Sequence, residues 1–434
     1  MRTLALTAGA LALLFAPPAP TSARRSSERV AGALAEAIPA APPGAASTTM
    51  TVEEYEPRST LVVPEHPVER ARYPFVDIHN HQDFDTMSAA ELDKLVADMD
   101  AINLRVMVNL SGGTGEELKK GLALVKAHHP DRFVLFANLS FDDLDAGYGP
   151  RAAKRFRDDA AAGARGLKIF KGFGMTLKDK DGRRVAVDDP RFDAVFEACA
   201  DLGLPVLIHT AEPASFFEPA DRFNERWLEL KQFPQRARPP DRFPSWEQLM
   251  AEQRRLFARH PRTRFVNAHL GWLGGNLARL GRLLDELPNV STEIGAVLAE
   301  LGRQPRTARE WFVKNQDRVL FGKDTWARDE YKVYFRVLET KDEYFDYYRK
   351  RHAFWKMYGL DLPDEVLRKL YFENALRLVP AIAKTGWPEA RRAERRRVEG
   401  GRGEQRQLCP PAWQVASPPR GSSRSERRAS APRS

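Results

Sequence analysis

The chain has 434 residues, of which 43% are hydrophobic and 29% charged, so it can bury a sizeable core and fold. Its formal net charge is +9, but residues 388–434 hold twelve Arg and five Glu (+7) and the first thirty residues carry +3, which leaves about −1 for residues 31–387. The folded part is therefore near neutral, and the net charge does not indicate nucleic-acid binding.

The first 23 residues have the order of a secretory signal. Arg2 supplies a positive start, residues 4–16 are apolar, and residues 21–23 are small. The apolar run is shorter than the roughly 20 residues that a membrane-spanning helix needs. We therefore expect a signal peptide over residues 1–23, export to the periplasm or the medium, and no stable membrane insertion after cleavage. An uncleaved membrane anchor is the alternative.

Residues 24–74 form an Ala/Pro-rich linker and a polar lead-in, and the pattern changes at residue 75. From there, eight short runs rich in Val, Ile, Leu and Phe alternate with amphipathic stretches. The runs cover residues 75–81, 105–110, 133–139, 166–170, 205–210, 264–270, 290–295 and 319–324. The helical stretches include residues 90–102, 116–128, 191–202, 246–260 and 273–287. This alternation predicts an α/β fold, a (β/α)8 TIM barrel, over residues 75–387.

An open doubly wound sheet is the alternative fold, but no G-x-G-x-x-G phosphate loop follows any of these strands. The barrel is predicted to carry two additions. One is a long aromatic loop over residues 211–244, after the fifth strand, and the other is a set of extra C-terminal helices over residues 326–380. Residues 388–434 read as a disordered Arg-rich tail.

Histidine and aspartate fall at the ends of the predicted strands. His79 and His81 end the first strand and share one face of it, because side chains alternate along a strand. His209 ends the fifth strand, His269 the sixth and Asp324 the eighth. In a barrel these strand ends surround one mouth, where barrel enzymes place their chemistry. Imidazole and carboxylate groups are suitable ligands for a divalent metal.

At this point the sequence resembles the amidohydrolase-related branch of the amidohydrolase superfamily, which includes amino-carboxymuconate-semialdehyde decarboxylase and pyrone-dicarboxylate lactonase. Five segments carry the resemblance in the same order along the chain, together with the closing residues 371–377. The segments are residues 76–81, 166–169, 207–210, 267–269 and 320–324. One departure is Lys323, which stands where many relatives have a small residue and which should point away from Asp324.

The resemblance implies one divalent metal, most simply zinc, held by His79, His81, His209 and Asp324. It implies that Asp324 and His269 are catalytic, with Asp324 moving the proton of a metal-activated water and His269 acting as acid/base or polarising the scissile carbonyl. Lys168, on the fourth strand, is expected to bind a substrate carboxylate. If Lys168 is carbamylated instead, it would bridge two metal ions.

Several further residues are weaker candidates for the pocket. Glu293 ends the seventh strand and either bonds to a metal ligand from outside the ligand set or has no role in the site, with neither alternative favoured. The others are Glu212, Lys171, Trp272 and Trp326, for which a solvated or packing role is the simpler interpretation.

Three functions fit this pattern. The first is hydrolysis of an amide, lactone or related ester bond in a small molecule. The second is metal-dependent, non-oxidative decarboxylation of an unsaturated or aromatic acid, and the third is a barrel that binds metal or ligand without turnover. We expect the hydrolase, with a small-molecule substrate and no nucleic-acid partner, because water is the only co-substrate that an exported hydrolase needs.

Overall fold

The computed structural model describes residues 50–388 apart from 143 and 353. The predicted signal peptide (1–23), the first part of the linker and residues 389–434 of the predicted tail lie outside the described residues. Within the described part of the chain, no helix combines the length and the apolar character needed to cross a membrane.

The core of the fold is a ring of short parallel strands, which confirms the predicted TIM barrel. They are β1 (Phe75–Asn80), β2 (Leu104–Asn109), β3 (Phe133–Leu135), β4 (Ala137–Asn138), β5 (Leu167–Ile169), β6 (Val206–Ile208), β7 (Phe265–Asn267), β8 (Val290–Glu293) and β9 (Val319–Leu320). They pair in the order β1-β2-β3 and β4-β5-β6-β7-β8-β9. The predicted third strand is thus present as two pieces, β3 and β4.

Hydrogen bonds outside the ladders join the two sheets into one ring. Phe136 lies between β3 and β4, and its N–H donates to Asn109 O over 2.9 Å, so the chain continues from one sheet into the other. On the opposite side, Ile78 N donates to Phe321 O over 3.0 Å and Asp324 N donates to His79 O over 2.7 Å. These two bonds connect β1 to the segment after β9 and close the barrel.

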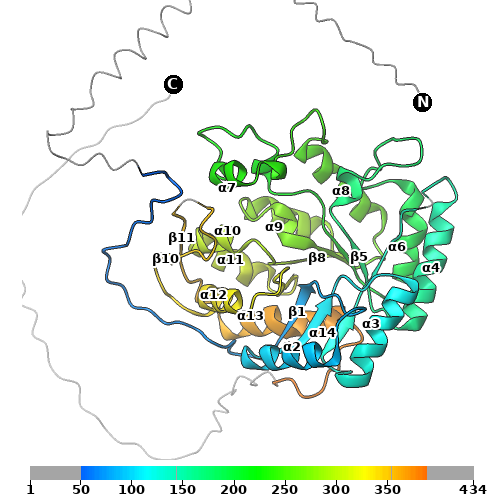
Figure 1. The fold of residues 1–434 in the computed structure, drawn as a ribbon, viewed down its shortest axis with the longest axis horizontal. Coiled ribbons are helices and arrows are strands. Elements are labelled where there is room, and N and C mark those ends of the chain that lie inside the picture. The colour runs from blue at the N-terminus through cyan, green and yellow to red at the C-terminus, as the bar shows by residue number, and fades with distance from the viewer. Residues whose placement is uncertain (1–49, 143, 353, 389–434) are drawn as a thin grey trace, which may run out of the picture.

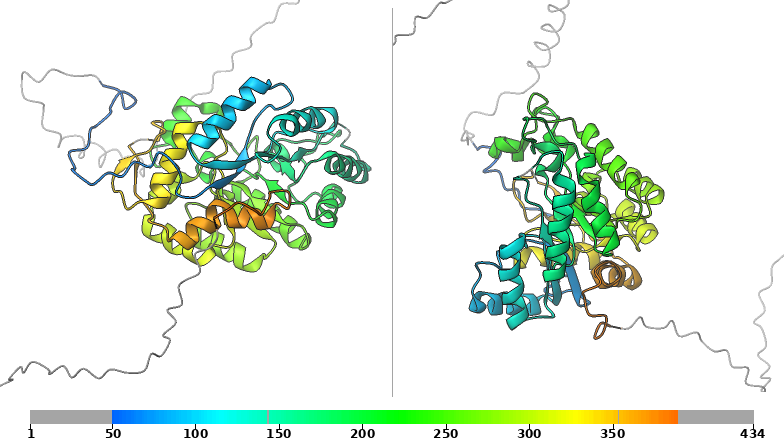
Figure 2. Two further views of the ribbon diagram at one scale, coloured as in Figure 1. Left: turned by 90° about the horizontal axis from the view of Figure 1, so that it is seen from below. Right: turned by 90° about the vertical axis from the view of Figure 1, so that its right-hand side faces the viewer.

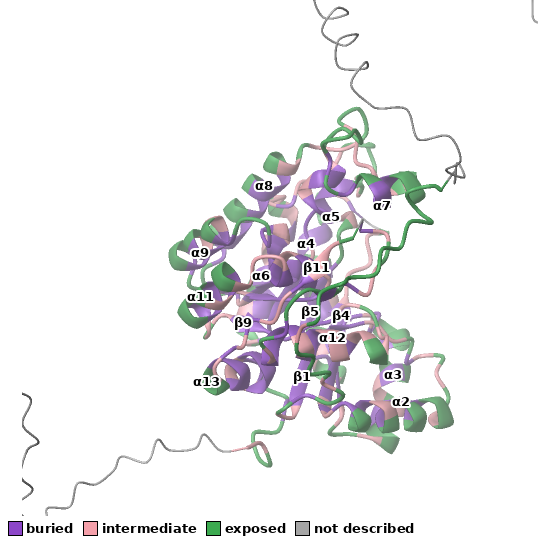
Figure 3. Cartoon of the chain, turned by 90° about the vertical axis from the view of Figure 1, so that its left-hand side faces the viewer, coloured by how far each residue is buried: buried purple, intermediate pink, exposed green. Residues whose placement is uncertain are grey.

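Helices surround this ring and turn their polar faces outward (Figures 1 and 3). The longer ones are α2 (Ala89–Ala101), α3 (Gly115–His128), α4 (Tyr148–Ala162), α6 (Asp193–Asp201), α8 (Trp246–Arg259), α9 (Leu277–Glu286), α11 (Pro305–Asn315) and α12 (Arg328–Glu339). Helix α2 illustrates the local signals: Ser88 caps Glu91 N, and the Glu91 side chain bonds back to Ser88 N. Five of these helices match the predicted helical stretches to within a few residues. Helix α6 begins two residues later than predicted, after a short 3-10 turn, and α9 begins four residues later than predicted.

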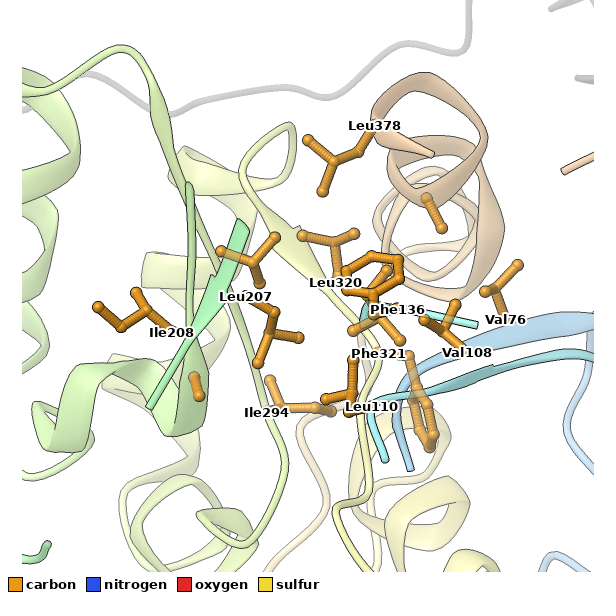
Figure 4. Close-up of a cluster of buried hydrophobic side chains, with 14 of the residues drawn as sticks. Val76, Val108, Leu110, Phe136, Leu207, Ile208, Ile294, Leu320, Phe321 and Leu378 are labelled. Atoms are coloured by element: carbon orange, nitrogen blue, oxygen red, sulfur yellow. The ribbon is translucent and has the colours of Figure 1, made fainter. Parts of the chain in front are cut away.

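Apolar side chains from strands and helices fill the interior (Figure 4). All six residues of β1 are buried, as expected for a strand covered on both faces. Val108, Leu207 and Leu320 gather in the same cluster, and each is at most 1% exposed. Phe136 fits only because Gly166 has no side chain, since a Cβ at Gly166 would overlap the Phe136 ring.

The additions lie over the C-terminal ends of the strands and along one side of the barrel. The long loop after β6 contains α7 (Trp227–Gln232), and α10 (Leu298–Gly302) follows β8. After α12 come a hairpin of β10 (Phe345–Asp346) and β11 (Lys356–Met357) and then α13 (Asp364–Arg368) and α14 (Asn374–Leu378), which lie beside β1 (Figures 1 and 2). The extended lead-in runs past the β10–β11 hairpin (Figure 1).

Candidate metal centre

The structure places the six predicted site residues in one region, within or just beyond their strands. His79 lies within β1 and His81 follows it directly. Lys168 is the middle residue of β5, and His209 follows β6. His269 lies two residues beyond β7, and Asp324 lies four residues beyond β9.

Four of these residues contact one another directly. Asp324 Oδ1 lies 3.3 Å from His79 Nε2 and 3.6 Å from His81 Nε2. Lys168 Nζ lies 3.2 Å from the same His79 Nε2. His79 and Lys168 are buried, whereas the side chains of His81 and Asp324 are 29% and 31% exposed. The cluster is therefore closed below and open toward the mouth of the barrel.

His209 and His269 form a second contact whose hydrogen bonds determine which ring nitrogens carry protons. His269 Nδ1 lies 2.8 Å from Gly295 O, and a carbonyl only accepts, so Nδ1 carries the proton. In the tautomer that carries this proton, His269 accepts at Nε2 from His209 Nδ1 over 3.3 Å. This leaves a lone pair on His209 Nε2, which is buried and has no hydrogen-bond partner among the described residues.

Glu293 fixes the orientation of two of the histidines. Its Oε1 atom accepts from His79 Nδ1 over 2.9 Å and from His269 N over 2.6 Å. Since Nδ1 of His79 is the donor, its Nε2 is unprotonated and lies near both Lys168 Nζ and Asp324 Oδ1. Gly322 makes room for this carboxylate, because a Cβ at Gly322 would overlap Glu293 Oε2. Sequence reasoning left the role of Glu293 open, and the structure shows these contacts.

Unusual backbone conformations place His269. It begins a left-handed turn, with φ/ψ of 59°/39°, and Leu270 and Gly271 continue it. Such angles are disfavoured for residues with a side chain, so the surrounding structure must hold them. The bond from His269 N to Glu293 is one such restraint. This turn directs the His269 ring toward His209 rather than along the strand.

Two groups of side chains among the described residues could hold a metal ion. One is His79, His81 and Asp324, and the other is His79, His269 and Glu293. Two imidazoles and a carboxylate suit a divalent ion such as Zn²⁺. The unprotonated His79 Nε2 fits the first group, because metal ligands need an unprotonated nitrogen. His209, the other predicted ligand, belongs to neither group, although its Nε2 atom has no hydrogen-bond partner among the described residues. In the second group, Glu293 Oε1 already accepts two hydrogen bonds.

Burial sets the charge states of the cluster. It lowers the pKa of His79 and of His209 well below the usual range, and the positive Lys168 adds to the effect. Burial likewise lowers the pKa of His81 to about 4 and that of Lys168 to about 8. Burial disfavours an ionised Asp324, but the nearby His79, His269, His81 and Lys168 outweigh it and lower its pKa to about 2. At neutral pH the imidazoles of His79, His81 and His209 are therefore neutral and Asp324 is ionised.

Aromatic and charged side chains surround the cluster. The Trp272 ring stacks on His269 with centroids 4.6 Å apart, and Phe170, 41% exposed, lies 5.8 Å from the His81 ring. Glu212 accepts from Lys171 over 2.6 Å and from Arg238 over 3.0 Å. Glu212 is thus tied into ion pairs rather than solvated, which corrects the simpler interpretation made from sequence.

Two hydrogen-bond partners of the histidines were not predicted from the sequence. Ser111 Oγ lies 2.8 Å from His81 Nδ1, and it follows β2, where no histidine or acid marked it. Asp77 bonds to backbone N–H groups of His79 over 3.0 Å and Lys323 over 3.1 Å and so joins β1 to the segment after β9. Its position before the His-x-His pair was visible in the sequence, but its partner across the barrel was not.

The family model described as Amidohydrolase matches residues 68–381 of the chain. The chain therefore belongs to the amidohydrolase family, as the resemblance implied. Members of this family act on small molecules with the help of metal ions, and the donor set described above is consistent with a divalent metal.

Solved structures with similar folds include a 2,6-dihydroxybenzoate decarboxylase bound to 2,6-dihydroxybenzoate, at 16% identity, 70% coverage of this chain, 99% of that chain and a TM-score of 0.45. An uncharacterised TIM-barrel protein from Bordetella bronchiseptica is 16% identical, with 71% of this chain and 99% of that chain covered and a TM-score of 0.43. A probable 2-pyrone-4,6-dicarboxylic acid hydrolase from Acinetobacter baumannii is 13% identical, with 70% of this chain and 98% of that chain covered and a TM-score of 0.38. A search of curated proteins found no match.

Proposed function

We propose that the chain is a metal-dependent hydrolase that cleaves an amide, lactone or related ester bond of a small molecule. One divalent ion, most simply zinc, would be held by His79, His81, His209 and Asp324. The observation that carries this proposal is the group of His79, His81 and Asp324, whose possible ligand atoms lie within 4.8 Å of one another, together with the buried and unpartnered Nε2 of His209.

Each remaining site residue has a role that its contacts support. A metal ion in this position supplies a bound water whose pKa is lowered toward neutrality. Asp324, ionised at neutral pH, can accept a proton at a carboxylate oxygen. His269 orients His209 through Nε2, and as an acid/base it would exchange a proton at that same atom. Lys168 can bind a substrate carboxylate or, if carbamylated, bridge two ions.

A decarboxylase is the second candidate, and Lys168 favours it. Its buried ammonium lies 3.2 Å from His79 Nε2, so a substrate carboxylate could approach the ligand cluster and a positive charge together. The two reactions differ in their products, since a decarboxylase releases carbon dioxide and a hydrolase consumes water. A barrel that binds metal without turnover is the third.

The first test is the metal content of the purified full-length chain after exhaustive dialysis, measured by mass spectrometry. One zinc per chain would support the four-ligand site, and two, with a mass gain on Lys168, would support the bridged form. The variant His79→Ala should hold no metal while remaining folded by circular dichroism. Metal retained in that variant, or none in a zinc-reconstituted wild type, would contradict the proposed site.

Turnover is then assayed on the metal-loaded chain with chromogenic esters and lactones, and in parallel with hydroxybenzoates for carbon dioxide release. Loss of ester or lactone cleavage in His79→Ala would assign hydrolysis to the site. Carbon dioxide release without cleavage would favour the decarboxylase. Export stays a proposal that rests on residues 1–23, and N-terminal sequencing of the protein recovered outside the cytoplasm would test it.

A further inference from the structure

Asp324, the proposed carboxylate ligand, has a backbone conformation that only glycine adopts readily. Its φ angle is +82°. On its N-terminal side the chain is fixed twice, because Asp324 N donates to His79 O and Lys323 N donates to Asp77 Oδ1 over 3.1 Å. A conformation of this kind persists only where the surrounding structure holds it. The restraint on the C-terminal side of Asp324 comes from a side chain.

That side chain is Lys323, which is completely buried. Its Nζ atom donates to Thr325 O over 3.2 Å and lies 3.4 Å from Thr325 Oγ1. The same ammonium forms an ion pair with Glu330 in helix α12. Lys323 therefore reaches past Asp324 and ties the peptide that follows it to α12. Lys323 thus fixes the chain on both sides of Asp324, through its backbone N–H before that residue and through its ammonium after it.

A cage of aromatic rings surrounds this ammonium. The rings of Tyr331, Tyr334 and Tyr348 have their centroids 5.6, 5.7 and 5.8 Å from Lys323 Nζ. A buried ammonium is stable only with such partners, so it resists displacement from this place. Tyr331 also donates to Asp77 Oδ2 over 2.6 Å. Helix α12 is thus linked to the side chain of Lys323 and, through Asp77, to its backbone N–H.

We propose that Lys323 is a positioning residue that holds the carboxylate of Asp324 against His79 and His81. Its ammonium sets the path of residues 323–325, and that path determines where the Asp324 side chain points. The inference rests on the proposed function, in which Asp324 is a metal ligand. The contacts of the Lys323 ammonium are with Thr325, Glu330 and the three tyrosine rings, so its effect on Asp324 passes through the backbone.

The test compares Lys323→Met and Glu330→Gln in the full-length chain. Methionine has a similar length but cannot donate to Thr325, and glutamine leaves the buried ammonium without an anionic partner. Lys332→Met is the matched control, because Lys332 lies in the same helix and pairs with Glu69 and Asp329 at the surface. Co²⁺ replaces zinc as the probe, since its visible absorption reports the ligand geometry.

Both variants should bind Co²⁺ about 10- to 100-fold more weakly in a chelator competition and show an altered visible spectrum, as outer-shell changes do. The control should match the wild type. A lowered melting temperature with wild-type affinity and spectrum would assign Lys323 a purely structural role and overturn the proposal. If Lys323→Met does not fold, Glu330→Gln decides by the same criteria.

Hydrogen exchange separates this inference from the proposed function. If the wild type binds no Co²⁺, the metal-dependent function fails, and exchange in the metal-free chain decides the positioning role. The peptide covering residues 321–327 should then exchange faster in both variants than in the wild type, while residues 104–110 of β2 stay unchanged. Unchanged exchange at residues 321–327 would overturn the positioning role.

Discussion

The Oε1 atom of Glu293 accepts hydrogen bonds from His79 Nδ1 and from His269 N, and its Oε2 atom accepts from Gly295 N. One buried carboxylate therefore fixes a ring on β1 and a backbone turn after β7. Because donors surround both of its oxygens, an amide in its place would turn an NH2 group toward another donor.

Glu293→Gln should for this reason weaken zinc binding by about 10- to 100-fold, as loss of an outer-shell partner typically does. Chelator competition with purified chain measures it. Glu286→Gln is the control, because among the described residues Glu286 pairs with Arg254 alone, at the surface. Equal zinc affinity in Glu293→Gln and the wild type would show that the histidines need no such support.

Lys168 leads to a prediction about pH. Its pKa of about 8 means that the ammonium is charged below pH 8 and neutral above it. If it binds a substrate carboxylate, kcat/KM for an anionic ester or lactone should fall above about pH 8 while a neutral analogue is unaffected. Lys168→Met should remove this difference between the two substrates. The same fall for both substrates would exclude carboxylate binding by Lys168.

At the scale of elements, the segment after β9 carries the proposed ligand Asp324 and also makes room for Glu293. Gly322 lies against Glu293 and His79, and a Cβ there would stand 3.0 Å from His79 Cβ and overlap Glu293. Neither neighbour can retreat, because His79 and Glu293 are both fully buried.

Gly322→Ala should consequently destabilise the fold by about 1–3 kcal/mol, the usual cost of overpacking a core, and also reduce bound zinc. Thermal unfolding and metal analysis measure the two effects. Gly275→Ala is the matched control, since a Cβ at Gly275 meets nothing within 4 Å. Similar unfolding temperatures for the two variants would show that the side chains around Gly322 leave room for a Cβ.

The lead-in is attached to the barrel through Asp342, in the segment after α12. Its buried carboxylate accepts from His66 N over 2.7 Å and contacts the His66 ring and Arg336. Burial alone would raise the pKa of Asp342, but these donors outweigh it and lower the pKa below 3.8. A lowered carboxyl pKa adds stability above pH 3.8, and this contribution is lost as the pH falls through the folded-state value.

Asp342→Asn should therefore lower stability at pH 7 and reduce its further loss between pH 4 and pH 2. Urea unfolding across this range, with Asp346→Asn as an exposed control, would measure the difference. A variant whose pH dependence equals that of the wild type would show that Asp342 does not contribute this acid-sensitive stability.

For the whole molecule, the proposed ligands come from β1, from the end of β6 and from the segment after β9, so a bound ion would connect distant parts of the ring. A ligand that binds only the folded chain stabilises it, by about 2.7 kcal/mol when its free concentration is 100 times Kd. Zinc removal with a chelator should lower the melting temperature of the wild type.

The variant His79→Ala should show no such shift, whereas His129→Ala should show the full one. His129 is a matched histidine, since it lies at the end of α3 and its ring bonds to Asp93 far from the proposed site. Scanning calorimetry with and without chelator measures both. A shift that survives in His79→Ala would place the stabilising ion elsewhere.

Much of the architecture was readable from the chain. The eight predicted strand positions and five helices are present, because barrel strands buried on both faces need continuous apolar runs and the helices around them need one apolar face. The interruption between β3 and β4 was not predicted, since it depends on Phe136 bonding to β2 while Ala137 bonds to β5. The order of apolar and polar residues in a segment does not indicate which neighbouring strand each residue pairs with.

Residue spacing alone indicated which residues lie near one another. His79, His81, His209, His269 and Asp324 fall at or just beyond strand ends, Lys168 lies within a strand, and a closed parallel barrel brings its strand ends to one mouth. Only the tertiary structure decided how they meet. Contacts between distant segments set the hydrogen bonds that run from Gly295 through His269 to His209. They also set the bond from His79 to Glu293 and the position of Lys323 beside Asp324. Hydrogen-bond direction and backbone strain arise from three-dimensional packing, which residue spacing does not specify.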